Sequence, residues 1–211
     1  MFIKKLNLLV LATLIFVGCV KDEEELPLKS NIITAKVEKG KDYASVFSSV
    51  KVFIYYYDTY VDGHYTTIEG NCYEAASSDY IDGGFSLTLP ETLESRCVVP
   101  LADVLWYDSG VKVSNISTRG IEITIKGYDK DGVFVDDFEC RRKSNKNVSG
   151  RFIYVDRDVT ITDSDNRRIF NLNLKKGWNM YFYKDNGYGY KSNIFSKTDE
   201  KDFQWYRSKD L

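Results

Sequence analysis

Short runs of alternating apolar and polar residues, separated by turn signals, follow one another along the chain from residue 32 onward. Alternation with a period of two predicts β-strands, because successive side chains of a strand point to opposite faces of a sheet. No stretch sustains the helical period of about 3.6 residues, so we expect little helix. The predicted strands are residues 32–37, 50–57, 65–69, 85–89, 121–126, 133–140, 152–155, 159–162, 169–174, 178–183, 188–195 and 203–206.

The patterns differ between strands and indicate how each is buried. In residues 121–126 isoleucines alternate with polar residues, as in a strand with one buried and one solvated face. Residues 50–57 are largely apolar or aromatic on both faces, which indicates a central strand. Asp62-Gly63 marks a hairpin, because glycine supplies the positive φ of tight turns. Residues 91–110 have the weakest pattern and are expected to hold a crossover or a short helical turn.

Many short strands joined by turns predict an all-β fold, an antiparallel β-sandwich of the Ig-like or transthyretin-like type. The predicted domain covers residues 31–211, with a subdivision near residues 110–120 as an alternative. Residues 50–63 and 121–132 both read as a strand followed by Tyr-Asp and Asp-Gly. Two similar β halves would explain this echo, and so would convergent hairpin chemistry.

The start of the chain has a different pattern. Lys4 and Lys5 precede an apolar run that ends at a small residue, and these are the parts of a secretory signal. The run is too short for a membrane span, which needs about 20 apolar residues. We therefore predict a signal peptide at residues 1–18 and an acidic, flexible tether at residues 19–30.

Gly18-Cys19, at the end of the apolar run, resembles the lipobox of bacterial lipoproteins. In those proteins the signal is cut before the cysteine, and the cysteine thiol then carries lipid. Phe16 departs from the pattern, which usually has Leu, Val or Ile there. The resemblance implies lipidation of Cys19, and two or three acyl chains hold a protein on a membrane far more firmly than one. An ordinary cleaved signal is the alternative.

The residues after the cysteine carry a second signal. Lys21, Asp22 and Glu23 resemble the surface-export signal of Bacteroidetes lipoproteins, although a solvated acidic tether explains the same charges. We therefore predict a lipid-anchored protein of the outer membrane that faces the cell exterior.

Three motifs lie within the β region: Tyr-Asp-Lys-Asp-Gly at residues 128–132, Asp-Arg-Asp-Val-Thr-Ile at 156–161 and Leu-Lys-Lys-Gly-Trp-Asn at 174–179. Together with the lipobox, they resemble a family of surface lipoproteins of gut Bacteroidetes that has no assigned activity. The motifs are turn and core patterns. The resemblance therefore implies a fold and a location, and it transfers no catalytic residue.

Charge and residue counts argue against several function classes. The chain has 29 basic and 31 acidic residues, and removal of residues 1–18 leaves 27 against 31, a net charge of −4. Nucleic-acid binding is not expected, because it needs clustered basic residues. His64 is the only histidine, so sites that need two histidines are excluded. We predict no enzyme activity, no cofactor and no metal site.

Three cysteines, Cys72, Cys97 and Cys140, follow Cys19. An odd count leaves at least one thiol unpaired. One disulfide among the three and three small buried side chains both fit this count. The 31 acidic residues likewise do not single out a carboxylate pair for glycoside hydrolysis.

Aromatic residues supply the one candidate binding surface, because the chain has 16 tyrosines and 3 tryptophans. In residues 178–183 the face that begins with Trp178 is expected in the core. The opposite face would then carry Tyr181 and Tyr183, beside two tyrosines of the returning strand. Exposed tyrosines across a hairpin would make a flat platform for sugar rings, although tyrosine also simply suits strands. The predicted platform comprises Tyr181, Tyr183, Tyr188 and Tyr190.

These observations predict a non-enzymatic β-sandwich binding module on a surface lipoprotein, with glycan as the first candidate ligand. The alternative is a structural or adhesive component that contacts other proteins, for example by edge-strand pairing. A hydrolase with carboxylates that the sequence does not single out is a third hypothesis. The expected partners are a membrane, through the N-terminal lipid, and a glycan or protein ligand.

Overall fold

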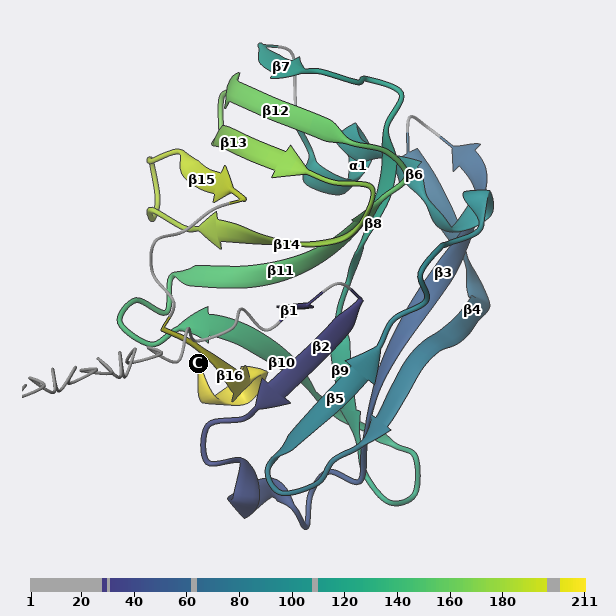
Figure 1. Cartoon of the computed structure of the whole chain (residues 1–211), viewed down its shortest axis with the longest axis vertical. Coiled ribbons are helices and arrows are strands. Elements are labelled where there is room, and N and C mark those ends of the chain that lie inside the picture. The colour runs from purple at the N-terminus through teal and green to yellow at the C-terminus, as the bar shows by residue number, and fades with distance from the viewer. Residues whose placement is uncertain (1–27, 30, 62–63, 108–109, 197–201) are drawn as a thin grey trace, which may run out of the picture.

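The computed structural model describes residues 28–29, 31–61, 64–107, 110–196 and 202–211 (Figure 1). This part of the chain is mostly β-strand with little helix, which confirms the predicted β-rich class. No helix within it is long and apolar enough to cross a membrane. The predictions for Cys19, Lys21, Asp22 and Glu23 lie outside the described residues. The helical elements are α1 (Leu101–Leu105) and three 3-10 turns, η1 (Gly40–Tyr43), η2 (Ser95–Cys97) and η3 (Ser208–Asp210).

A small antiparallel sheet has the strand order β1-β2-β5. Along its middle strand the buried and exposed residues alternate, and Ile33 and Ala35 face inward. Phe85 and Leu87 do the same on the neighbouring strand. The alternation predicted for residues 85–89 is therefore confirmed, and β2 alternates in the same way. The bounds are β1 (Leu28–Lys29), β2 (Ile32–Lys36) and β5 (Gly84–Thr88).

A strongly curved sheet of 13 strands forms the rest of the fold. Its main path runs β4-β3-β9-β10-β11-β14-β15-β13-β12-β7, with β16 beside β10 and β8 beside β11 and β6. The bounds are β3 (Ser49–Val61), β4 (His64–Asp79), β6 (Val99–Pro100), β7 (Val111–Val113), β8 (Arg119–Ile123), β9 (Ile125–Tyr128), β10 (Phe134–Arg142), β11 (Val148–Val155), β12 (Val159–Ser164), β13 (Arg168–Leu174), β14 (Gly177–Lys184), β15 (Ser192–Phe195) and β16 (Phe203–Arg207).

The large sheet is mixed, so the prediction of a purely antiparallel fold is wrong at one strand pair. β13 and β14 follow each other in sequence, but β15 lies between them. A strand in that position is antiparallel to β14 and parallel to β13, because β13 and β14 run in opposite directions. The predicted strand 188–195 is also shorter than expected and begins at Ser192.

The single strand predicted at residues 121–126 is two strands. β8 ends at Ile123 and pairs with β11, whereas β9 begins at Ile125 and pairs with β10 and β3. Thr124 lies between them and is exposed. The chain therefore changes partners at Thr124, and the sheet forks there.

Two hydrophobic cores lie on opposite faces of β11. Phe152 and Tyr154 belong to the first core, between the small sheet and the facing part of the large sheet. Ile153 and Val155 belong to the second core, which is closed by α1 and the strands β12, β13 and β14. Alternate side chains of one strand thus enter different cores, so β11 has no solvated face.

The weakly patterned stretch at residues 91–110 holds η2, β6 and the five-residue helix α1, as expected for a crossover with a short helical turn. The large sheet includes strands from both sides of residues 110–120. The subdivision there stays a prediction. Cys72, Cys97 and Cys140 are all free thiols, and Cys97 and Cys140 are buried. Burial is the main cause that raises the pKa of each of these two thiols, which fits unreactive core residues.

Candidate functional site

Tyr181 is buried, so its prediction as an exposed platform residue is wrong. Its side chain is 2% exposed and belongs to the second core. The hydroxyl donates a hydrogen bond to Oε2 of Glu122 at 2.9 Å. Burial, followed by the nearby Glu122 carboxylate, raises the pKa of Tyr181. The reason is topological, because β14 lies between β11 and β15 and buries Phe182 on its other face as well.

Tyr183 is half-buried and supports its neighbours rather than presenting a free ring. Its hydroxyl is 2.9 Å from Oγ of Ser192 on β15. The guanidinium of Arg151 lies over the ring at 4.6 Å from the ring centroid, in cation–π geometry. The predicted platform of four tyrosines therefore does not form.

The other two tyrosines are on the surface. Tyr188 is 106% exposed and Tyr190 is 77% exposed, on the loop that joins β14 to β15. A large aromatic ring normally buries most of its area, so these two exposed rings are a candidate contact surface. We call residues 185–191 the tyrosine loop.

Hydrogen bonds within the tyrosine loop define its conformation. The backbone N–H of Gly187 donates to Oδ1 of Asp185 at 2.9 Å. Nδ2 of Asn186 donates to the carbonyl of Lys191 at 2.6 Å. Gly187 and Gly189 both have a φ of 85°, in the left-handed region that favours glycine. The loop thus presents its tyrosines from a backbone with defined turns.

A shallow hollow of about 520 Å³ adjoins the tyrosine loop. The parallel pairing of β13 with β15 sets Ile169 opposite Asn193, which brings an aliphatic and an amide side chain together. Ile169 is 44% exposed, and Nζ of Lys191 donates to Oγ of Ser164 at 3.3 Å. The lining residues are Ile169, Asn186, Tyr190, Lys191 and Asn193.

The sequence does not predict the hollow, although it does predict that Tyr190, which lines it, is exposed. Ile169 reads as an ordinary outward residue of an alternating strand. Asn186 reads as a turn residue and Asn193 as part of a predicted strand. Only the insertion of β15 beside β13 brings these residues together, and no local pattern predicts that insertion.

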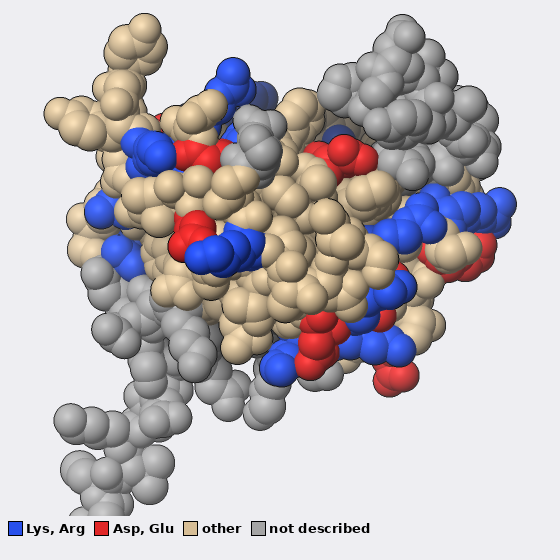
Figure 2. Space-filling model, turned by 90° about the horizontal axis from the view of Figure 1, so that it is seen from above, with Lys and Arg blue, Asp and Glu red and all other residues tan. Residues whose placement is uncertain are grey.

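Charges of both signs are interspersed on the end of the molecule that carries β7 and β12, which Figure 2 shows from above. Lys112 and Asp163, for example, form an ion pair of 2.9 Å there. Neither sign forms a continuous patch in this view. A face of this kind has no single-sign field to attract a highly charged ligand.

No known protein-family model, curated protein or solved structure matches this chain. Within the described part of the chain, no group of three His, Cys, Asp or Glu side chains could hold a metal ion. The tyrosine loop and its hollow are therefore a candidate binding site.

Proposed function

We propose that the protein is a lipoprotein of the outer membrane, anchored through Cys19 and displayed on the cell surface, whose β domain binds glycan at the tyrosine loop. The exposure of Tyr188 and Tyr190 beside a hollow lined by amides carries this proposal. Sugar rings have apolar C–H faces and a rim of hydroxyl groups. Aromatic rings cover the faces, and amides both donate to and accept from the hydroxyls.

The role proposed is binding rather than catalysis. The hollow is lined by an aliphatic group, two amides, an ammonium and a phenol. Glycoside hydrolysis needs two carboxyl groups on either side of the bond, and this lining has none. An Ig-like or transthyretin-like sandwich is the fold we propose for the module, and the two sheets that enclose the first core support it.

Substitution of both exposed tyrosines tests the site. We expect the double variant Tyr188→Ala, Tyr190→Ala to lose binding on a glycan array by about tenfold or more, because each ring contributes about 0.5–1.5 kcal/mol beyond its buried area. Tyr55→Ala is the matched control, because Tyr55 is a 37% exposed tyrosine on β3. Equal binding by the double variant, or no glycan bound by the wild type, would contradict the proposal.

A second experiment tests the lipid anchor and the location on the cell surface. Cys19→Ala is expected to move the protein from the membrane to the soluble fraction, because the acyl chains supply the membrane affinity. Proteinase treatment of intact cells should digest the wild-type domain. If Cys19→Ala stays with the membrane, the lipid anchor is wrong, and if the wild type is fully protected, the surface location is wrong.

The adhesive alternative has one supporting observation of its own. β4 is 16 residues long, ends the path of the large sheet and pairs only with β3 among the described residues. A long strand at a sheet edge presents backbone groups that can pair with a strand of another protein. A protein partner captured through this edge, with no glycan bound, would favour this alternative.

A further inference from the structure

The fork of the large sheet contains a second cavity, of about 350 Å³, away from the tyrosine loop. β8 pairs with β11 and β9 pairs with β10, whereas β10 and β11 pair with each other only at Cys140–Gly150 and Arg141–Ser149. β8, β9, β10 and β11 therefore surround an opening in the sheet. Thr124, which joins β8 to β9, lies at its edge. The cavity follows from the topology of the sheet and is not a surface irregularity.

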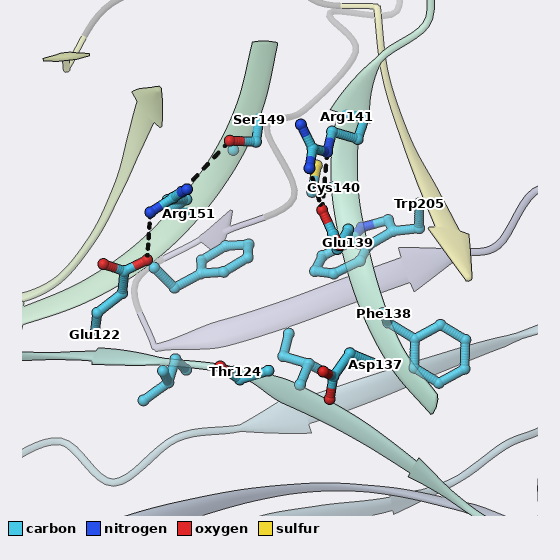
Figure 3. A pocket seen from close by; sticks show the side chains of 14 residues that line it. Glu122, Thr124, Asp137, Phe138, Glu139, Cys140, Arg141, Ser149, Arg151 and Trp205 are labelled. Carbon is cyan, nitrogen blue, oxygen red and sulfur yellow. Dashed lines mark hydrogen bonds and ion pairs between the residues drawn. The ribbon is translucent and has the colours of Figure 1, made fainter. Parts of the chain in front are cut away.

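Two walls of the cavity carry paired charges, as Figure 3 shows. On one wall, Nη1 of Arg151 lies 3.3 Å from Oε1 of Glu122. On the opposite wall, Nε of Arg141 donates to Oε2 of Glu139 at 2.9 Å. Both guanidinium groups thus have carboxylate partners, so the walls offer donors and acceptors side by side with little excess charge.

The floor of the cavity is aromatic. The rings of Phe152 and Trp205 stack at a centroid distance of 5.6 Å with an interplanar angle of 1°. Trp205 is 4% exposed and comes from β16, the last strand of the chain. An apolar floor below polar walls is the common arrangement of small-molecule sites, whose volumes start at about 300 Å³.

Two buried polar atoms that belong to this cavity have no hydrogen-bond partner among the described residues. They are Oδ1 of Asp137, an acceptor, and Nε1 of Trp205, a donor. Both atoms have almost no accessible area, so they are unpaired groups within the cavity wall rather than contact atoms for a ligand. Burial raises the pKa of the Asp137 carboxyl, nearby Lys126 opposes this shift, and Asp136 adds to it.

We propose that this cavity binds a small, neutral, hydroxyl-rich molecule such as a free monosaccharide, independently of glycan contact at the tyrosine loop. A hydroxyl group both donates and accepts. It can therefore donate to a wall carboxylate such as that of Asp137 and accept from the guanidinium group of Arg141 or Arg151. The lining has three carboxylates (Glu122, Asp137 and Glu139) against two guanidinium groups, a formal excess of one negative charge, which disfavours a phosphate or a dicarboxylate.

A thermal-shift and calorimetric titration of the purified protein tests the proposal. The probes are glucose, galactose, mannose and N-acetylglucosamine, with glutamate and inorganic phosphate as charged comparators. We expect at least one neutral sugar to bind and to raise Tm, and neither charged probe to do so. Failure of all four sugars at about 10 mM, or stabilisation by phosphate or glutamate alone, would overturn the proposal.

Variants then assign the binding to the cavity. Asp137→Asn is expected to weaken sugar binding by about tenfold, because a hydrogen bond to a charged acceptor is lost. The same variant should keep or raise Tm, because it removes a buried carboxylate whose ionised form is disfavoured in the folded state. Asp79→Asn, at an exposed aspartate of β4, is the matched control.

Two further outcomes separate this site from the tyrosine loop. The variant Tyr188→Ala, Tyr190→Ala should bind the free sugar normally even if it fails on the glycan array. Unchanged sugar affinity in Asp137→Asn, or loss of free-sugar binding in the tyrosine double variant, would place the sugar elsewhere and overturn the assignment. Loss of binding at the tyrosine loop alone would leave the cavity proposal standing.

Discussion

The two cores of this protein are closed in different ways. The first core is rich in aromatic side chains, with Phe47, Phe85 and Phe138 within contact distance of one another or of Trp205. The second is mainly aliphatic, with residues such as Ile161 and the fully buried leucines of β13.

The two cores also differ in what encloses them. Facing sheets lie about 10 Å apart, and in the first core aromatic rings share that layer with aliphatic side chains. In the second core, the large sheet curls over the side chains and α1 closes it. β11 contributes to the difference in composition, since it supplies large rings to one side and branched aliphatic side chains to the other.

Adjacent substitutions on β11 test whether the two cores unfold together. Phe152→Ala should cost about 3–5 kcal/mol and Ile153→Ala about 2–5 kcal/mol, because each leaves a cavity in a different core. We expect each variant to unfold in a single transition with a lower urea midpoint, measured by circular dichroism and by tryptophan fluorescence. Ile169→Ala, at a 44% exposed position of β13, is the control with a small effect.

Two separate unfolding transitions in Ile153→Ala would mean that the two cores do not unfold together. Trp205 lies in the first core and Trp178 packs against it, whereas Trp106 is 66% exposed, so tryptophan fluorescence mainly reports the first core. If the fluorescence stayed native while the circular dichroism signal fell, the two cores would be independent folding units. A single transition seen by both probes would show that the shared strand couples them.

A glycine pair tests how closely the strands around β11 approach each other. A Cβ at Gly120 would lie 2.5 Å from the carbonyl oxygen of Tyr154, which is backbone and cannot move aside. At Gly150 it would meet the terminal Cε of Met180 at 2.2 Å, and that side chain is flexible. We expect Gly120→Ala to cost about 1–3 kcal/mol in urea denaturation and Gly150→Ala clearly less. Equal losses would show that the β8–β11 contact is looser than described.

The last expected effect, similar in size to that of Gly120→Ala, concerns the polar contact between the second core and the sheet fork. Tyr181→Phe removes the hydroxyl that donates to Glu122 and should lower the free energy of unfolding by about 1.5–3 kcal/mol, near the lower limit because Arg151 still pairs with the carboxylate. Thermal denaturation measures the loss. Tyr183→Phe is a useful comparison, because its hydroxyl bonds to neutral Ser192 and should matter less. An unchanged midpoint in Tyr181→Phe would mean that the buried hydroxyl contributes nothing.

Much of the local structure follows from short-range pattern. Strands such as β5 and β13 alternate as predicted, because one face of each is buried and the other is solvated. The Asp-Gly turn after β9 is also local, since Oδ1 of Asp129 accepts from the N–H groups of Asp131 and Val133. The Asp129 side chain thus stabilises the turn through bonds to residues two and four positions ahead.

The candidate site was only half predictable. The sequence predicts Tyr188 and Tyr190 to be exposed, but on a strand at residues 188–195, whereas they lie on the loop before β15. Tyr181 was misplaced because alternation shows which residues share a face, but not whether that face meets solvent or another core. The fork cavity was not predicted at all, because it depends on a break in a strand whose sequence alternates without interruption.

The sequence by itself determined the β-rich class, most strand positions and the turns between them, because these depend on residues a few positions apart. It also contains the N-terminal segment with Lys4, Lys5, an apolar run and Cys19, on which the predicted cellular location depends. Only the tertiary structure decided the order of the strands, the insertion of β15 between β13 and β14, and the burial of both faces of β11 and β14. Strand pairing joins residues far apart in the chain, so the burial of a face depends on partners that no local pattern specifies.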